Sequence, residues 1–307
     1  MTVLHAIGNT SLVPLRKIAP RSGAEVLVKL EWENPTGSMK DRMADAVIAR
    51  AEADERLTPG GTVLEYTGGS TGTSLALVAA AKGYRIKIVT SDAFSQEKRD
   101  HMAALGAELI LVPSEGGRTT KKLILDMIEK ARELSREPNT FWTDQLHNHD
   151  SIAGYHALGE EIWAQTNGQV VAFAHCIGTG ASSRGVATVL KRKNPAVKAV
   201  AVEPAESSVL KGGQPGPHKI EGVGIGYTPP LWEPSLFDEI IAVKTDDAKE
   251  MTRRLAREEA IFGGTSSGAN VIAALQIAER LGRGAKVVTL IADSGLKYLS
   301  TDVYKQR

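Results

Sequence analysis

The sequence predicts an α/β fold of two lobes, with mostly parallel, twisted sheets that helices cover on both faces. Short runs of β-branched and other apolar residues alternate along the chain with amphipathic helical stretches. Continuous apolar strands are typical of parallel sheets, because both faces of such a sheet are buried. Glycine-rich turns join several strands to the helices that follow them. With 307 residues, the chain is long enough for two lobes.

The first predicted helix follows Lys40. Residues 43–54 carry apolar side chains at helical spacing, and Ser38 with Asp41 fits a helix start in which each side chain caps the other's backbone. The other predicted helices cover residues 73–83, 95–107, 121–135, a stretch after the turn at 178–185, 246–260 and a stretch from about 267. The predicted strands are 62–66, 85–89, 108–113, 170–177, 198–204, 239–244 and 286–292.

An irregular region, residues 142–159, is the predicted passage between the lobes. We therefore assign residues 39–145 to a smaller lobe, and residues 1–38 together with 146–307 to a larger one.

Composition excludes several classes of partner. There are 37 Lys and Arg against 36 Asp and Glu, so neither nucleic acid nor an anionic membrane is expected as a global partner. No run approaches the roughly 18 apolar residues that a membrane span needs. The N-terminus lacks the layout of a signal peptide, and the single cysteine, Cys176, lies in an apolar run. We expect a cytoplasmic protein whose cysteine is buried and inert.

Lys40 is the first candidate catalytic residue. It lies in the sequence NPTGSMKDR, within the first turn of the predicted helix, where the helix dipole favours anions over cations. Arg42 adds a second positive charge nearby. Both effects are expected to lower the pKa of the Lys40 amine, and a lysine with an available lone pair is what Schiff-base chemistry requires. An ordinary solvated lysine is the alternative interpretation.

Two glycine-rich turns are candidate anion sites. The first is Thr67-Gly68-Gly69-Ser70-Thr71-Gly72, and the second runs from Gly178 through Thr179, Gly180, Ala181 and Ser182 to Gly185. Each turn joins a buried strand to a helix, where backbone N–H groups attract anions. Neither is a Walker loop, because no Gly-Lys-Ser/Thr follows. A dinucleotide site at the second turn, with Glu203 on the ribose, is the alternative, although the third glycine of that motif falls at Ser183.

Two further segments have simpler explanations. Gly263 to Ala269, which includes Ser266, precedes another helix, and its serines could serve as caps. The cluster His147-Asn148-His149-Asp150 could ligate a metal, but a solvated polar loop is the better interpretation, because no cysteine or second acidic cluster accompanies it. We therefore predict no metal site.

The motifs together resemble those of the cysteine synthase and cystathionine β-synthase family, which are fold type II pyridoxal-phosphate enzymes with a tryptophan synthase β-like architecture. The resemblance runs in order along nearly the whole chain. Its motifs here are IGNTSLVPL, NPTGSMKDR, EYTGGSTGTSLA, FSQEKRDHMAALGAELILV, GTGASSRGVATVLK, EGVGIGYTP, GGTSSGAN and DSGLKYLST.

The resemblance implies the following roles. Lys40 would hold pyridoxal 5'-phosphate as a Schiff base and act as the base at the substrate α-carbon. In the larger lobe, the cofactor phosphate would lie against Gly178, Thr179, Gly180, Ala181 and Ser182, and Ser266 would face the pyridine nitrogen. In the smaller lobe, Ser70 would contact the cofactor. The substrate carboxylate would be bound by Thr67, Gly68, Gly69 and Thr71, with Gln145 closing over it, while Gly222 would line the site.

The implied reaction is β-replacement through an aminoacrylate intermediate. An activated L-serine such as O-acetylserine or O-phosphoserine would lose its β-substituent, and sulfide would add to give L-cysteine. A cystathionine β-synthase, another β-substituted-alanine synthase and a serine or cysteine dehydratase-desulfhydrase remain alternatives. Family members commonly form homodimers, and some bind the tail of serine acetyltransferase; the sequence alone decides neither.

Three departures from the family pattern lie near the expected substrate site. Ser70 stands where an asparagine is usual, and Gly68 stands where a serine commonly helps to bind the carboxylate. The segment Ala157-Leu158-Gly159 lacks the threonines that usually precede its glycine. The sequence therefore defines the cofactor and the reaction type more closely than the substrate.

Overall fold

The chain divides into two units, each built around one sheet. A computed structural model describes residues 2–20, 22–118 and 120–305. The first unit comprises Met1–Ile7 and Lys40–Gly154, and the second comprises Gly8–Met39 and Tyr155–Arg307. The first unit extends past the proposed lobe boundary at residue 145 because helix α5 (Asp150–Ala153) contacts α1 (Lys40–Ala53). A Cβ atom on Gly154 would lie only 2.8 Å from the carbonyl oxygen of Arg42.

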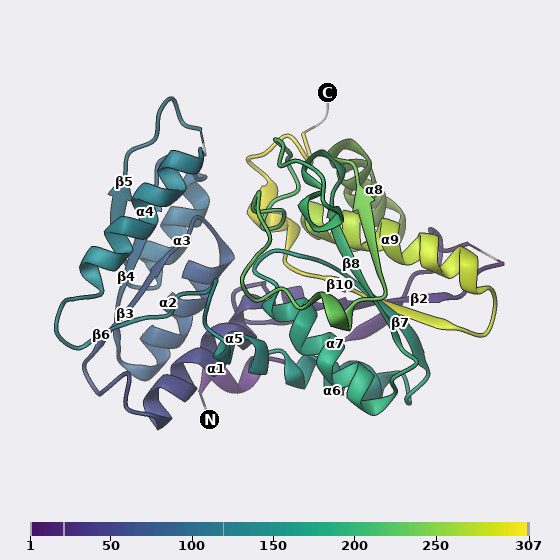
Figure 1. Cartoon of the computed structure of the whole chain (residues 1–307), viewed down its shortest axis with the longest axis horizontal. Helices are drawn as coiled ribbons and strands as arrows, with labels where there is room; N and C mark the ends of the chain where they lie inside the picture. The colour runs from purple at the N-terminus through teal and green to yellow at the C-terminus, as the bar shows by residue number, and fades with distance from the viewer. Residues whose placement is uncertain (1, 21, 119, 306–307) are drawn as a thin grey trace. The chain divides into compact units, whose positions relative to one another are not determined.

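The first unit holds a four-stranded parallel sheet in the order β5-β4-β3-β6. Figure 1 labels its elements, drawn from purple to teal. Besides α1, α5 and a short 3-10 helix, η1 (Val3–Ala6), they are β3 (Thr62–Tyr66), α2 (Ser70–Lys82), β4 (Arg85–Ser91), α3 (Gln96–Ala104), β5 (Glu108–Val112), α4 (Lys121–Leu134) and β6 (Thr140–Trp142).

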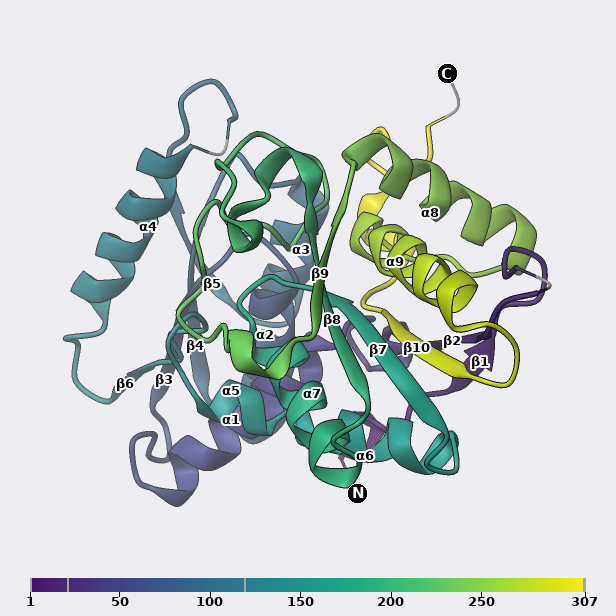
Figure 2. The ribbon, with the colours of Figure 1, turned by 45° about the vertical axis from the view of Figure 1, so that its right-hand side comes forward.

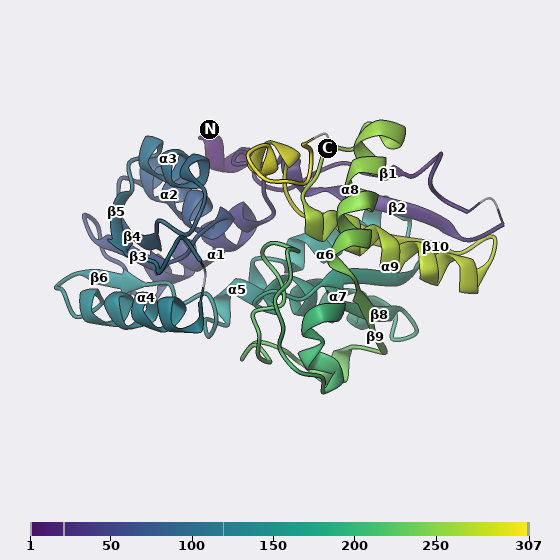
Figure 3. The same cartoon turned by 90° about the horizontal axis from the view of Figure 1, so that it is seen from above.

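Both faces of this sheet are covered. Leu64 and Val89 pack against Leu123 and Met127 of α4, while Ile88 points to the face where α2 approaches it at Gly72. Figure 3 shows α4 on one side of the strands and α2 and α3 on the other. Strand β3 is buried along its whole length, as expected for the interior of a parallel sheet.

The second unit holds a six-stranded sheet in the order β1-β2-β10-β7-β8-β9, in which only the β1–β2 pair is antiparallel. Its strands and α-helices are β1 (Leu12–Pro14), β2 (Glu25–Leu30), α6 (His156–Gln165), β7 (Val170–Cys176), α7 (Ala181–Lys193), β8 (Lys198–Pro204), β9 (Glu239–Val243), α8 (Thr245–Glu259), α9 (Thr265–Leu281) and β10 (Lys286–Ile291). Its 3-10 helices are η2 (Glu31–Glu33), η3 (Ala205–Ser207), η4 (Val209–Lys211), η5 (Pro234–Leu236) and η6 (Gly295–Tyr298).

The core of the second unit lies between this sheet and α9. Ala274 and Ile277 of α9 pack with Val26 and Val28 of β2 in one apolar cluster, which α8 extends through Leu255. Helices α6 and α7 lie together on the opposite face, as Figure 2 shows. The predicted α/β fold with mostly parallel sheets is therefore confirmed.

The structure differs from the predicted elements in several places. Strands β1, β2 and β6 were not predicted, and the region expected to be irregular, residues 142–159, contains α5 and the start of α6. Helix α2 begins at Ser70, three residues before the predicted start. Helix α9 begins at Thr265, two residues before the predicted start. Helix α1 begins at Lys40, and Ser38 forms a β-bridge with Asp293, so the capping pair of Ser38 and Asp41 stays a prediction.

Cys176 is buried and forms no disulfide. Burial raises the pKa of its thiol far above the ordinary range. Among the described residues, no helix is both long and apolar enough to cross a membrane.

Candidate functional site

Lys40 is the first residue of α1 and is half-buried. Asp41 and Arg42, the next two residues of the helix, are buried. The prediction that Lys40 lies in the first turn of a helix is confirmed.

The backbone directly before Lys40 is held against the end of β10. The N–H of Met39 donates to the carbonyl of Ala292 at 2.9 Å, and the N–H of Ser294 donates to the carbonyl of Gly37, also at 2.9 Å. The N–H of Ala292 in turn donates to Ser267 Oγ at 3.1 Å. One residue, Ala292, therefore binds both the peptide that precedes Lys40 and the start of α9.

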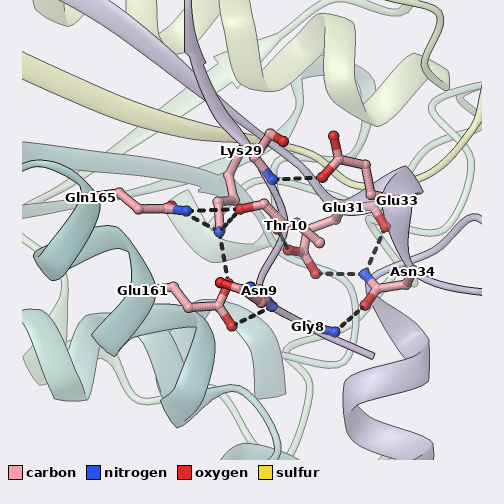
Figure 4. A network of polar contacts seen from close by, with 10 residues as sticks. Gly8, Asn9, Thr10, Lys29, Glu31, Glu33, Asn34, Glu161 and Gln165 are labelled. Carbon is pink, nitrogen blue, oxygen red and sulfur yellow. Dashed lines mark hydrogen bonds and ion pairs between the residues drawn. The ribbon is translucent and has the colours of Figure 1, made fainter. Parts of the chain in front are cut away.

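A buried polar network fixes the other end of the segment that leads to Lys40. Figure 4 shows Asn34 donating to the Glu31 carboxylate at 3.1 Å and accepting the N–H of Gly8 at 2.8 Å. Thr10 donates to the same carboxylate at 2.7 Å. Lys29, which is fully buried, forms an ion pair with Glu161 at 2.7 Å. Because buried charges persist only when they are paired, this network specifies one arrangement of residues 8–34.

The turn from Thr67 to Thr71 lies between β3 and α2, and the structure brings it together with Gln145. The Thr71 hydroxyl donates to Gln145 Oε1 at 2.8 Å, and Gln145 Nε2 donates to the carbonyl of Tyr66 at 3.2 Å. Within the turn, the N–H of Gly69 donates to Thr67 Oγ1 at 3.2 Å. Ser70 is the first residue of α2, and Gly69 at the N-cap position supplies no side chain to cap the helix.

Gly68, in the same turn, lies under the ring of Phe94. A Cβ atom built on Gly68 would be 2.2 Å from two atoms of that ring. Phe94 therefore occupies the space that a side chain at position 68 would need. The sequence did not identify Phe94, because only folding brings β4 and its following loop next to this turn.

Glu65 lies close before the turn from Thr67 to Thr71. It is fully buried on β3, where its carboxylate accepts hydrogen bonds from the Thr143 hydroxyl at 2.6 Å, the N–H of Gln145 at 2.9 Å and the N–H of Tyr66 at 2.8 Å. Burial raises the pKa of Glu65 from 4.5 to about 7, against the lowering effect of these hydrogen bonds.

The second glycine-rich turn, Gly178 to Ser182, lies between β7 and α7, and its glycines are required by geometry. Gly180 has a φ of +91°, a backbone conformation that residues with a side chain rarely adopt. A Cβ atom on Gly178 would lie 2.5 Å from the carbonyl oxygen of Gly222, so the structure brings these two predicted residues together. Thr179 Oγ1 accepts the N–H of Ala181 at 3.4 Å.

The start of α7 has unused hydrogen-bond donors. Gly180 occupies the N-cap position and makes no side-chain cap. Among the described residues, the N–H groups of Ser182 and Ser183 have no hydrogen-bond acceptor. These donors, the nearby hydroxyls of Thr179 and Ser182, and the helix dipole suit a phosphate group. The turn therefore fits a small phosphorylated molecule.

Ser266 is the second residue of α9 and is 6 % exposed. Its carbonyl accepts from the Cys176 thiol at 3.6 Å, while its hydroxyl makes no hydrogen bond within the part of the chain that the structure describes. That hydroxyl is therefore available to a bound molecule.

Two alternatives from the sequence find little support. Both carboxylate oxygens of Glu203 accept backbone N–H groups, from Leu210 at 2.8 Å and from Lys211 at 3.2 Å, so the carboxylate already binds its own loop. In residues 2–20, 22–118 and 120–305, no cluster of His, Cys, Asp and Glu could hold a metal ion. His147 instead contacts Asp144 at 2.9 Å on the surface.

The sequence missed two residues beside the second turn, His175 and Asn270. His175 Nε2 lies 2.9 Å from Ser182 Oγ, and Asn270 contacts the other ring nitrogen. A polar residue inside the apolar run VVAFAHCI was the signal that could have identified His175.

Comparisons with known proteins agree on one family. The family described as pyridoxal-phosphate dependent enzyme matches residues 3–293. A cysteine synthase of Staphylococcus aureus is 43 % identical over 305 residues, which are 98 % of this chain and 96 % of that protein. A crystal structure of cysteine synthase from Entamoeba histolytica matches with a TM-score of 0.93 and 39 % identity, over 99 % of this chain and 90 % of that one. An O-acetylserine dependent cystathionine β-synthase from Helicobacter pylori matches with a TM-score of 0.92 and 35 % identity, over 99 % and 98 %.

Proposed function

Because the chain belongs to the family of pyridoxal-phosphate dependent enzymes, we propose that it catalyses β-replacement on an activated L-serine. O-acetylserine or O-phosphoserine with sulfide, giving L-cysteine, is the reaction that its relatives favour. The observation that carries the proposal is the start of α7, where two unused N–H groups and a positive φ at Gly180 provide a phosphate cradle.

Pyridoxal phosphate supplies an electron sink that draws charge from the α-carbon of an amino acid attached to it. We assign its phosphate to Gly178, Thr179, Gly180, Ala181 and Ser182. The Ser266 hydroxyl is assigned to the pyridine nitrogen, which a neutral hydroxyl would not hold protonated. Lys40 Nζ would anchor the cofactor covalently, since its amine stands at a helix N-terminus that disfavours the ammonium form.

Lys40 is also the proposed acid/base residue. When the substrate amine displaces it from the cofactor, Nζ would remove the proton from the substrate Cα and later return one. The hydrogen bonds that Ala292 accepts from the N–H of Met39 and donates to Ser267 Oγ support this role, because they fix the backbone directly before Lys40.

The turn between β3 and α2 is assigned to the substrate carboxylate. Thr67, Gly68, Gly69 and Thr71 would bind it through N–H groups and hydroxyls, Gln145 would close over it, and Gly222 would line the site. The 2.8 Å bond between Thr71 and Gln145 supports this assignment, since it holds the amide beside the turn. Ser70 is assigned to the cofactor, in the place where the family pattern has an asparagine.

Cystathionine formation is the second candidate, because one relative is named an O-acetylserine dependent cystathionine β-synthase. A homodimer, a serine acetyltransferase tail as a partner and a cytoplasmic location remain proposals carried by the resemblance. The assignment of substrate binding to the smaller lobe and of phosphate binding to the larger lobe is likewise a proposal carried by the resemblance.

Lys40→Ala is the direct test. Purified wild-type protein, reconstituted with pyridoxal phosphate and reduced with borohydride, should carry the cofactor on Lys40 when its peptides are mapped by mass spectrometry. Lys40→Ala should yield no labelled peptide and lose β-replacement by at least about 10³-fold, because one amine serves as anchor and as acid/base.

Lys121→Ala is the matched control, since Lys121 is likewise the first residue of an α-helix but is exposed. It should label and react like wild type. Labelling of another lysine would overturn the assignment. Pairing O-acetylserine, O-phosphoserine and serine with sulfide or homocysteine then identifies the substrates, and keto acid formed without a nucleophile would indicate a dehydratase-desulfhydrase instead.

A further inference from the structure

A buried histidine stands directly behind the phosphate cradle. His175, on β7, is 1 % exposed, and its Nε2 lies 2.9 Å from Oγ of Ser182, the second residue of α7. Its ring also approaches that of Phe173, with 6.0 Å between the ring centroids. The roles proposed above do not use this histidine.

Asn270 determines which ring nitrogen of His175 carries the proton. Asn270 is fully buried, and its Oδ1 accepts the N–H of Cys176 at 2.7 Å while its Nδ2 donates to the carbonyl of Leu290 at 2.8 Å. These two backbone partners fix the orientation of the amide. The second Nδ2 hydrogen then faces His175 Nδ1, 3.2 Å away, so Nδ1 must accept. The hydrogen-bond network therefore assigns the ring proton to Nε2.

This tautomer sets the direction of the bond to Ser182. Nε2–H donates to Ser182 Oγ, so the hydroxyl proton of Ser182 must point away from the histidine. Ser182, His175 and Asn270 superficially resemble a nucleophile triad. A triad needs a bare Nε2 facing the serine and a third group that accepts from Nδ1–H, and both conditions are reversed here.

We propose that His175 is a positioning residue that fixes the Ser182 hydroxyl as a hydrogen-bond donor to the cofactor phosphate. The inference rests on the proposed function. An anion at the start of α7 meets the N–H groups of Ser182 and Ser183, and a hydroxyl oxygen turned toward it would repel it. By occupying a lone pair of that oxygen, His175 leaves the proton as the group that faces the turn.

The first test reads the tautomer without any substitution. Long-range ¹H–¹⁵N correlation spectra of the wild-type holoenzyme should show the proton of His175 on Nε2. A proton on Nδ1 would contradict the proposal. This measurement applies even if every His175 variant fails to fold.

The second test measures the affinity of the apoprotein for pyridoxal phosphate and the ³¹P shift of the bound phosphate. His175→Leu should raise the Kd about tenfold and move the ³¹P resonance, as expected for a lost hydrogen bond to a charged group. Ser182→Ala should weaken binding at least as much, and the double variant no further, because both changes remove the same hydrogen bond. His175→Gln, which retains a side-chain N–H donor, should restore most of the affinity.

Val170→Ala is the matched control, because Val170 is buried at the start of the same strand, whereas His175 lies near its end. It should lower the melting temperature while changing the Kd less than about twofold. Additive effects of the His175 and Ser182 variants, or an unchanged ³¹P shift in His175→Leu, would overturn this inference alone. Wild-type apoprotein that binds no pyridoxal phosphate would overturn the proposed function as well.

Discussion

Phe94 and Gly68 form one unit of packing at the proposed substrate turn. Because a Cβ atom at position 68 would lie 2.2 Å from the Phe94 ring, a glycine at 68 and a large residue at 94 require each other. The serine that the family pattern places at position 68 cannot be added here without displacing the ring. The shape of the substrate turn therefore depends on this pair of residues.

Gly68→Ser should lower the free energy of unfolding by about 1–3 kcal/mol, the usual cost of overpacking. Phe94→Ala should also destabilise the protein, because the ring packs against the core of the first unit. The double variant should lose less free energy of unfolding than the two single variants together, by roughly 1 kcal/mol or more, because the serine at position 68 meets no clash once the Phe94 ring is gone. Urea titrations of the four proteins measure this coupling, and strict additivity would contradict the proposed clash.

Much of the candidate site was predictable at the scale of single residues, for reasons that are local. Lys40 at a helix start and the glycine turns at 67–71 and 178–182 follow from strand–turn–helix patterns along the chain. Phe94 and His175 did not, because their roles depend on neighbours that only folding supplies. His175 meets Asn270 across 95 residues of sequence.

The elements show the same division between local and long-range causes. Strands β3, β4, β5, β7, β8, β9 and β10 were predicted because their apolar runs are continuous. Strand β2 was missed because Lys29 interrupts its apolar pattern, and that lysine can be buried because Glu161 and Gln165 of α6 and the carbonyl of Thr10 bind its ammonium group. The sequence around Lys29 does not indicate that a carboxylate so far along the chain will pair with it.

Glu161→Ala and Lys29→Met should therefore have unequal costs. Glu161→Ala removes a carboxylate from a fully buried ammonium and should lower the free energy of unfolding by about 3–5 kcal/mol. Lys29→Met should cost clearly less, because Glu161 is 18 % exposed and water can reach it. Chemical denaturation of both variants measures the difference. Glu160→Ala, at the half-buried neighbouring position on α6, is the control; it removes only surface ion pairs with Arg192 and Lys193 and should change stability by less than about 1 kcal/mol.

At the scale of the whole molecule, the chain passes between its two units three times, after residues 7, 39 and 154. From the sequence we assigned residues 39–145 to the smaller lobe, and residues 2–7 and 146–154, which belong to the first unit, lay outside that assignment. Those segments join it through packing, as the fit of α5 against α1 at Gly154 illustrates.

Glu65 should give the whole protein an unusual dependence of stability on pH. Its pKa is raised from 4.5 to about 7 in the folded state, so between these values the folded protein binds more protons than the unfolded chain. The stabilisation that protonated Glu65 adds to the free energy of unfolding is therefore fully present below about pH 4.5. It is lost as the pH rises through about 7, by roughly 3 kcal/mol at most.

Urea denaturation at several pH values checks this prediction. Glu65→Gln should remove that downward slope, whatever its constant effect on stability. Glu108→Gln, an exposed position on β5 of the same sheet, should retain the slope. An identical pH profile for wild type and Glu65→Gln would contradict the raised pKa.

The short span from Asn34 to Lys40 is fastened at both ends, by Glu31 near its start and by Ala292 near its finish. Because both ends of this segment are held by hydrogen bonds, it should tolerate substitutions but not insertions or deletions. One added residue would advance the register of α1 by about 100° and swing the amine to another side of the helix. Natural insertions and deletions should therefore be excluded from this span, and engineered loops should be grafted elsewhere.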